Sequence, residues 1–521
     1  MISDTRTNSN LSIKTDLFEI LCLVGLFVLF LRFLYSAVQV YGIPYGIDFG
    51  EGYLADASLK IITGHNPYHP IQNPPWIVCS YPPLYPIING ILMFVFGPNL
   101  LPGRFIATAS FLGILGLTIL IFRKLGVGST IAIISAGLLF AFPWPVRWAQ
   151  VVRVDTLGIA LALGGIYIWL RSEKKSDAIL SAILFACAVF TKQSLLSAPI
   201  AVLIYAFLSR DRRKFIFILL FVAFVGVTYG ISGILTGGGI FLHLFKYTAN
   251  EYFLLRFTSG LGAYIKSTWI LQVIALISFF MPGALAGYRR IFIAYYILAH
   301  LTLVTYGFEG SDTNYFIEPL IASIFLAGFA FDSLSRIPHK LQSAKGLPKP
   351  ENIAPILLIA LIIVSGFINS NDFRVHRING DRLQSGLGLL RLATSAPGDI
   401  LCEDASFTLL AGKKVIFQPY IMSLLYKKGK WDQSEFVQSI RDKKYSLIML
   451  RVNLNTPKNT ENASLGYEAA GFDRWTDEME DAVRENYTIY DAYDVGISNP
   501  WFAYIPKFDP ESLYENRPPE P

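Results

Sequence analysis

Two acidic side chains stand close together in a polar segment that follows the first long apolar run. The segment 41–83 contains Asp48 and Glu51, which are three residues apart. Residues at this spacing share a face of a helical turn, so both carboxylates can point the same way. A carboxylate at a dry interface can act as a general base and take the proton of a hydroxyl or amine. The spacing indicates a candidate catalytic pair, and a solvated loop with turn glycines is the structural alternative.

A second polar segment, 144–155, combines cations with a carboxylate. Arg147 and Arg153 carry guanidinium groups, which bind phosphate oxygens through paired hydrogen bonds. Asp155 lies at the predicted first turn of the next helix, where a carboxylate also suits the helix dipole. The segment is a candidate phosphate site, and an interfacial belt of aromatic residues with an aspartate cap is the alternative.

Two more charges occupy costly positions between or inside apolar runs. Lys192 lies between two short runs, where it can bind a phosphate group or extend to the surface. Glu318 lies within a run, and a charge at the centre of a membrane helix costs about 2.5–3.5 kcal/mol. Charges that persist at such a cost are candidates for function. The 4 cysteines form no CxxC pair and no metal-ligand spacing, so we expect no cofactor, although a divalent metal is possible.

The composition shows what kind of chain carries these residues. Of its 521 residues, 53% are hydrophobic and only 16% are charged, whereas a soluble chain has about 25% charged residues. The deficit lies in residues 17–370, while 371–521 resemble an ordinary soluble domain. We therefore expect two domains, 1–370 in the membrane and 371–521 outside it. The net charge of +6 is modest for this length and does not indicate a nucleic-acid partner.

The long apolar runs predict a polytopic membrane protein. They are residues 17–40, 84–97, 104–122, 129–143, 154–171, 178–191, 196–208, 214–236, 268–287, 291–306, 316–333 and 353–370. The first run is too long for a signal peptide, so we treat it as a retained helix. The run 84–97 contains Pro86 and is short, which is typical of a re-entrant or interfacial helix. About eleven spans remain.

Positive charges set the expected orientation of these spans. With 84–97 excluded, every basic loop falls on the side of the N-terminus: 123–124, 171–175, 210–214, 289–290 and 336–349. The positive-inside rule makes that side cytoplasmic. The segments with Asp48, Arg153, Lys192 and the stretch 307–315 then lie outside, together with the C-terminal domain. We expect a multi-pass protein of the plasma (inner) membrane with a cytoplasmic N-terminus.

The C-terminal region predicts a small α/β domain. Residues 398–402 and 444–450 read as buried strands, and 433–442 read as a helix. Glu403 and Asp404 follow the first strand, at an edge where ligands often bind, although solvated loop acids explain them more simply.

A series of short motifs in this order resembles the GT-C fold glycosyltransferases, which include protein O-mannosyltransferases and aminoarabinose transferases. The motifs are Asp48 with Glu51-Gly52, Asn66-Pro67-Tyr68, Tyr81-Pro82-Pro83-Leu84-Tyr85-Pro86, Arg153-Val154-Asp155-Thr156-Leu157, Thr191-Lys192-Gln193 and Asn314-Tyr315-Phe316-Ile317-Glu318-Pro319. The resemblance covers about residues 17–370. It implies a polyprenyl-phosphate sugar donor, inversion at the sugar, and an active site at the outer membrane face. The acceptor would be a glycan, a lipid or a protein.

The resemblance also implies roles for individual residues. The acidic residue of the family's first loop acts as the base or positions the acceptor, and this role carries over to Asp48, with Glu51 as its rival. Many relatives have adjacent acidic residues there, whereas this chain has Phe49-Gly50 between them. The second acidic position carries over to Asp155. The expected substrate contacts are Arg153, Lys192, Arg147, Tyr81, Asn314 and Glu318.

Two other functions are compatible with a polytopic chain. A transporter or flippase of lipid-linked saccharides would be expected to show paired repeats with interrupted helices, and the sequence shows no such symmetry. A non-catalytic membrane-anchored protein would not need so many spans. We therefore favour the glycosyltransferase.

Overall fold

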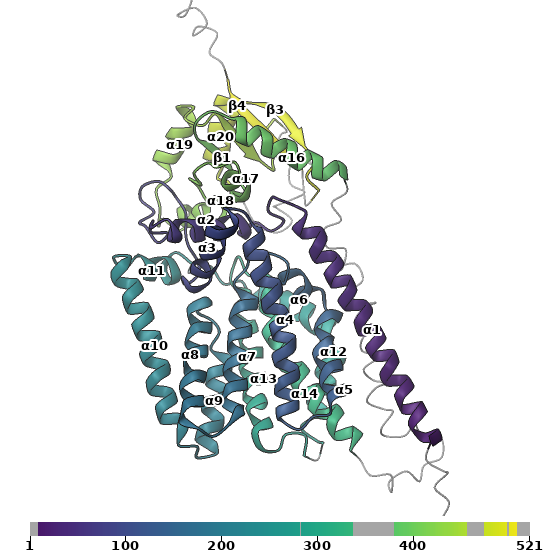
Figure 1. Ribbon diagram of the computed structural model, residues 1–521. Helices are drawn as coiled ribbons and strands as arrows, with labels where there is room; N and C mark the ends of the chain where they lie inside the picture. Colours follow the sequence, from purple (N-terminus) through teal and green to yellow (C-terminus); the bar gives the residue numbers. More distant parts are fainter. Residues whose placement is uncertain are drawn as a thin grey trace, which may run out of the picture.

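The computed structural model describes residues 9–248, 250–281, 283–336, 380–455, 474–496 and 500–507, with side chains from residue 20 onward. In Figure 1 the long helices form a bundle, the strands lie beyond one end of this bundle, and α2 and α3 lie between the bundle and the strands. The long helices and those of intermediate length are α1 (Ser9–Tyr41), α4 (Leu101–Lys124), α5 (Ser129–Gly137), α7 (Asp155–Arg171), α8 (Lys175–Thr191), α9 (Ser197–Leu208), α10 (Arg213–Leu235), α12 (Leu254–Ile277), α13 (Ile291–Leu301) and α14 (Ile317–Ser335).

Shorter helical segments connect these helices or lie across their ends. They are α2 (Gly50–Ile62), α3 (Leu84–Phe96), η1 (Leu138–Ala141), α6 (Pro143–Trp148), α11 (Gly239–Phe241), η2 (Leu242–Lys246), η3 (Gly287–Arg290), η4 (Thr302–Gly307) and η5 (Thr313–Phe316). Helices as short as these are not stable alone in water, so tertiary packing must hold them in place.

Apolar helices make the chain a multi-pass membrane protein. Within the described residues, 6 helical stretches are long and apolar enough to cross a membrane. The stretch Thr313–Ser335, which contains α14, is 89% buried and lies at the centre, whereas α10 is only 6% buried and faces outward. The helices α7 and α8 have 17 residues each, and the apolar run 353–370 lies outside the described residues. The count of about eleven spans therefore stays a prediction.

The segment 237–267 opens with three glycines and continues through aromatic and charged residues, a pattern that predicts an interfacial amphipathic helix. The structure differs, because the long helix α12 already begins at Leu254 and ends at Ile277. Residues such as Leu255 are largely exposed on this helix, as expected for a helix that faces lipid. Arg256 and Lys266 interrupt the apolar pattern at the start of this helix, so the sequence does not reveal where it begins. A membrane helix tolerates them there because long cationic side chains can extend toward the membrane surface.

The basic loops meet at one end of the helix bundle. Helix α4 has 24 residues, so its ends lie about 36 Å apart. Arg104 lies in its first turn, and Arg123 and Lys124 lie in its last turn. At that far end Arg289 Nη2 donates to the carbonyl of Leu125 (3.0 Å), and Arg336 binds the carbonyl of Gly126. The cations of several loops therefore share the end opposite Arg104.

A four-stranded sheet forms the core of the C-terminal region. Its strands are β1 (Ile400–Cys402), β2 (Leu447–Leu450), β3 (Tyr487–Tyr493) and β4 (Trp501–Pro506), in the order β1-β2-β4-β3. Strands β1 and β2 are parallel and fully buried, which explains their continuous apolar sequence, while β4 pairs antiparallel with both β2 and β3. The accompanying helices are α16 (Gly380–Ser395), α17 (Ala405–Leu410), α18 (Pro419–Lys427), α19 (Ser434–Arg441) and α20 (Asp477–Asn486).

The two expected strands and the expected helix are present as β1, β2 and α19. The boundary between 370 and 371 lies outside the described residues, so the division into two domains remains a prediction.

The C-terminal region attaches to the segment 41–83 by main-chain hydrogen bonds. Trp76 N donates to the carbonyl of Ile416 (2.7 Å), and Gln418 N donates to the carbonyl of Trp76 (2.9 Å). Nearby, Gly46 N donates to Ser406 Oγ (2.8 Å), and the Tyr53 hydroxyl donates to the carbonyl of Glu403. The polar segment that carries Asp48 is therefore enclosed between the helix bundle and the sheet region.

Candidate functional site

A cavity of about 350 Å³ lies where the helix bundle meets the C-terminal region. Segments from the whole chain form its wall: Phe49, Gly50, Tyr53, Leu54, Ala57, Val78, Cys79, Ser80, Tyr81, Arg153, Lys192, Gln193, Ser194, Thr248, Asn250, Phe308, Glu309, Gly310, Ser311, Tyr315, Gln418, Tyr420 and Ile421. Three of the residues expected to bind substrate, Tyr81, Arg153 and Lys192, are among them. Concave sites with a few converging polar groups are the usual place for ligands.

The first charged pair at the cavity joins Arg153 to Asp48. Arg153 Nε donates to Asp48 Oδ1 at 2.7 Å, and a second guanidinium nitrogen contacts the same oxygen. Burial raises the pKa of the Asp48 carboxyl, but the charges of Arg153 and Arg147 outweigh burial and hold this pKa below its usual range. Asp48 is therefore ionised, and its charge is neutralised by a cation that faces the cavity.

The second charged pair joins Lys192 to Asp155. Lys192 Nζ lies 2.6 Å from Asp155 Oδ1, and Asn314 Nδ2 donates to the same oxygen at 2.9 Å. Asp155 is only 1% exposed, and its Oδ2 has no hydrogen-bond partner among the described residues. The Lys192 ammonium also lies 4.5 Å from the centre of the Tyr315 ring. Two cations thus face one cavity, each held from behind by a carboxylate.

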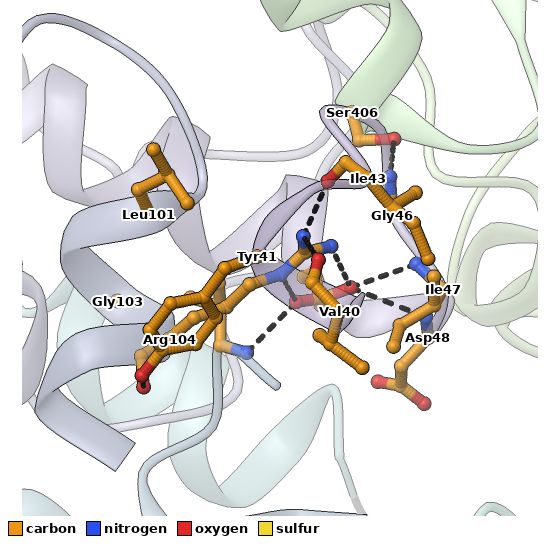
Figure 2. A network of polar contacts seen from close by, with 12 residues as sticks. Val40, Tyr41, Ile43, Gly46, Ile47, Asp48, Leu101, Gly103, Arg104 and Ser406 are labelled. Carbon is orange, nitrogen blue, oxygen red and sulfur yellow. Dashed lines mark hydrogen bonds and ion pairs between the residues drawn. The ribbon is translucent and has the colours of Figure 1, made fainter. Parts of the chain in front are cut away.

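Glu51 is used differently from Asp48. Its side chain is fully buried and accepts from Arg104 Nε (2.9 Å) and Nη2 (3.0 Å). The same carboxylate accepts from the backbone N–H groups of Ile47 (2.8 Å), Asp48 (3.3 Å) and Val152 (3.0 Å). Figure 2 shows this network, with the guanidinium of Arg104 at its centre.

Arg104 extends the network to the end of α1. Its guanidinium donates to the carbonyls of Val40 (2.8 Å), Ile43 (2.5 Å) and Tyr45 (2.8 Å). All five donors of a guanidinium can be used in this way when several carbonyls converge on it. One buried ion pair therefore fixes both the loop that carries Asp48 and the segment that carries Arg153.

Three other expected residues lie off the cavity wall. Arg147 lies over the Trp148 ring, with its Cζ 5.2 Å from the ring centre. Glu318 lies in the first turn of α14 and is 7% exposed, and Ser197 Oγ donates to its Oε2 at 3.4 Å. Asn314 reaches the site through its bond to Asp155. Tyr81 does line the cavity, and burial raises the pKa of its hydroxyl.

The cavity also has an acidic side that we did not expect from the sequence. Glu309 is half-buried in the wall, and its backbone N–H donates to the carbonyl of Glu251 (2.9 Å). Asn250 Nδ2 donates to the Glu309 carbonyl (2.8 Å). Burial raises the pKa of the Glu309 carboxyl, against the charge of Lys428. The cavity wall therefore carries two cations, Arg153 and Lys192, and one carboxylate, Glu309.

Two further residues at the site were overlooked at the level of sequence, Gly50 and Arg104. A signal existed for Arg104, which is a charge at the start of an apolar run and so carries an insertion cost. Within the described residues, no group of three or more His, Cys, Asp or Glu side chains could hold a metal ion.

The chain is similar in sequence to one protein family and in structure to several solved membrane proteins. A family model described as dolichyl-phosphate-mannose-protein mannosyltransferase matches residues 80–235, which is less than half of the chain. ArnT from Cupriavidus metallidurans, solved with bound undecaprenyl phosphate, has a TM-score of 0.58 at 12% identity and matches 90% of this chain and 97% of its own. No curated protein sequence matches at a significant level.

Two larger enzymes share the architecture as well. The arabinofuranosyltransferase AftD from Mycobacteria has a TM-score of 0.51 at 16% identity, over 92% of this chain and 40% of its own. The archaeal oligosaccharyltransferase AglB from Archaeoglobus fulgidus, solved in complex with an inhibitory peptide and a dolichol-phosphate, has a TM-score of 0.54 at 10% identity, over 96% and 75%. At identities this low the structural similarity establishes a shared fold and nothing more. The function must therefore be argued from the site.

Proposed function

We propose that this chain, which shares its fold with ArnT and AglB, is a membrane glycosyltransferase that moves a sugar from a polyprenyl-phosphate donor to an acceptor. The observation that carries the proposal is the pair of cations, Arg153 and Lys192, that face one cavity with a carboxylate behind each of them. The matched family is described as using dolichyl-phosphate-mannose, and ArnT and AglB were solved with undecaprenyl phosphate and a dolichol-phosphate, which fits a phosphate site at the end of a bundle of apolar helices.

The donor phosphate is assigned to the basic side of the cavity. In the proposed reaction an acceptor oxygen attacks the anomeric carbon, and the bond from that carbon to the phosphate oxygen breaks. The electron pair of this bond leaves with the lipid phosphate, which gains negative charge. Arg153 and Lys192 stabilise that charge, and such stabilisation is usually a large term in catalysis. Attack from the opposite face inverts the configuration at the sugar.

Asp48 is the proposed general base. Its side chain lies directly behind the cavity wall, bound to Arg153 and next to the wall residues Phe49 and Gly50, and in the proposed reaction it takes the proton of the acceptor group. Glu51 is fully buried beneath this loop and paired with Arg104, so we assign it the role of positioning Asp48 and Arg153. Asp155 and Asn314 orient Lys192, and Tyr81 contributes to the wall.

The site is proposed to work on the extracytoplasmic side of the plasma membrane. Cations of several basic loops collect at the end of the bundle opposite Arg104 and the cavity, and by the positive-inside rule this supports a cytoplasmic location for that end. The N-terminus would then be cytoplasmic and the C-terminal region outside. A cavity at the membrane face lets the donor keep its lipid tail in hydrocarbon while its phosphate reaches Arg153.

A transfer assay tests this function. The purified protein in lipid nanodiscs is offered a panel of radiolabelled polyprenyl-phosphate sugars, with an acceptor extract or with water alone. We expect release of sugar from one donor, and loss of that release in Lys192→Met. If no donor is consumed while the lipid-linked sugar moves between the leaflets of a vesicle, the protein is a flippase and the proposal is wrong.

A further inference from the structure

We infer that Arg153 changes partner during the reaction: it holds Asp48 in the empty site and passes to the donor phosphate when the donor binds. Gly50 is the positioning residue that gives the guanidinium room for both contacts. This inference rests on the proposed function, because it assumes that the site receives a phosphate. Its consequence is that Asp48 becomes an available base only after the donor has bound.

The contacts of Arg153 place it between two possible anions. Its guanidinium binds Asp48 Oδ1 and also forms part of the cavity wall. The Arg153 side chain is 17% exposed and that of Asp48 is 9% exposed, so the cation is the more accessible partner. Its Cζ lies 5.2 Å from the centre of the Trp148 ring, and this ring provides a flat surface on which a planar guanidinium can turn.

A glycine at position 50 is explained by this arrangement. A Cβ atom at Gly50 would overlap the Cζ, Nη1 and Nη2 atoms of Arg153. The backbone of Gly50 is not among the glycines with positive φ, and the residue begins the helix α2. Any residue could therefore adopt its backbone conformation, and the reason for glycine is the space occupied by the guanidinium.

The exchange also explains how Asp48 can act as a base although Arg153 lies beside it. An aspartate bound to an arginine is a weak base, because the cation stabilises the carboxylate form. A donor phosphate that engages the five N–H donors of Arg153 competes with Asp48 for them. When Arg153 moves to the phosphate, the stabilisation of the Asp48 carboxylate falls, and its affinity for the acceptor proton rises.

The exchange predicts that removal of a carboxylate improves anion binding. Binding of undecaprenyl phosphate is measured on the full chain in nanodiscs for the wild type, Asp48→Asn, Arg153→Gln and the double variant. We expect Asp48→Asn to bind about tenfold more tightly, because Arg153 no longer has a competing partner. The gain should disappear in the double variant. Asp48→Ser provides a second, independent removal of the carboxylate.

Two controls make the test specific. Asp481→Asn removes one negative charge from a surface ion pair on α20, away from the cavity lining, and should leave binding unchanged. In a Gly50→Ala background the added methyl group already displaces the guanidinium, so Asp48→Asn should give little further gain. A full tenfold gain in binding in that background would show that Gly50 does not position Arg153.

The outcomes separate this inference from the proposed function. If the wild type binds undecaprenyl phosphate and Asp48→Asn binds it equally or more weakly, the exchange is overturned and the donor site stands. If neither binds it, the proposed donor class is wrong together with the exchange.

Discussion

Two carboxylates three residues apart receive opposite environments in this protein. The Asp48 side chain is 9% exposed and is paired with Arg153, which lines the cavity, whereas Glu51 is fully buried and is paired with Arg104 and backbone N–H groups. Since a buried, fully paired carboxylate cannot reach a substrate, the difference favours Asp48 as the proposed base and Glu51 as the proposed positioning residue. The two residues should therefore respond differently to the same substitution.

Asp48→Asn should remove the base and keep the fold. We expect the transfer rate to fall by about 10²–10⁴-fold, the usual contribution of a general base. The midpoint of thermal unfolding should fall less than in Glu51→Gln, because Arg153 keeps its access to the cavity and the asparagine retains an oxygen that can accept from Gly50 N. The measurement is the initial rate of sugar transfer at saturating donor, and a rate within twofold of the wild type would promote another residue to the role of base.

Glu51→Gln should damage the fold instead. Arg104 has no exposed surface, and without a counter-charge its burial costs about 3–5 kcal/mol. We expect a clearly lower midpoint of thermal unfolding. The double variant Glu51→Gln/Arg104→Gln should lose less than the two single variants combined, because the charges are coupled. A Glu51→Gln protein with normal stability and no activity would contradict the structural role.

At the scale of elements, the segment 41–83 is held in place by the C-terminal region. The turn that starts α17 contributes directly: Asp404 caps this helix by accepting from Ser406 N (2.8 Å), and Ser406 Oγ accepts from Gly46 N (2.8 Å). Tyr45 stacks on Phe407 from the same helix, with ring centres 5.2 Å apart. Asp404 therefore supports this attachment through the α17 cap, whereas the side chain of Glu403 accepts from the backbone N–H of Arg451 within the C-terminal region.

Asp404 makes this attachment sensitive to pH. Burial raises the pKa of Asp404 to about 6 from a usual 3.8, although Arg451 opposes the change. Because the folded state binds this proton more tightly than the unfolded chain, the contribution of Asp404 to stability is fully present below about pH 4 and is lost as the pH rises through about 6. The loss is on the order of 1–3 kcal/mol for this single group.

Asp404→Asn checks this dependence. The asparagine keeps an oxygen that can cap α17, so we expect the variant to retain the fold and to lose this contribution to the pH dependence. Unfolding midpoints are compared at pH 5 and pH 8 for both proteins. If the difference between the two pH values is the same in the variant as in the wild type, Asp404 is not the responsible group.

At the scale of the whole molecule, the cavity exists only because distant segments meet. Its basic side comes from Arg153 and Lys192 in the helix bundle, and its acidic side comes from Glu309. The C-terminal region adds Gln418 and Tyr420 to the wall. A donor phosphate at the basic side leaves the acidic side for the acceptor, and a carboxylate there disfavours an anionic acceptor group.

Glu309→Gln should therefore act on the acceptor alone. We expect KM for the acceptor to rise about three- to tenfold, while KM for the donor and the rate of donor hydrolysis in water stay unchanged. Glu251→Gln is the matched control, since this exposed neighbour lies outside the cavity lining. An equal rise of both KM values would show a general disturbance of the site and contradict an acceptor role.

The sequence by itself determined that the chain is a multi-pass membrane protein, and it singled out the segments that we propose carry its chemistry. Long apolar runs must be buried in lipid or protein, and costly charges such as Lys192 stand out against them. The buried strands β1 and β2 were also predictable, because their residues are continuously apolar between polar neighbours. The order of the short motifs identified the GT-C fold, which the comparisons confirm.

Only the tertiary structure decided which charges pair. Spacing along the chain placed Asp48 and Glu51 together, yet their partners Arg153 and Arg104 come from segments 105 and 53 residues away. Ion pairing depends on distance and burial in space, and neither quantity is encoded in local periodicity. For the same reason the space required by a guanidinium at Gly50, and the acidic wall at Glu309, became visible only once the helices and the C-terminal sheet were assembled.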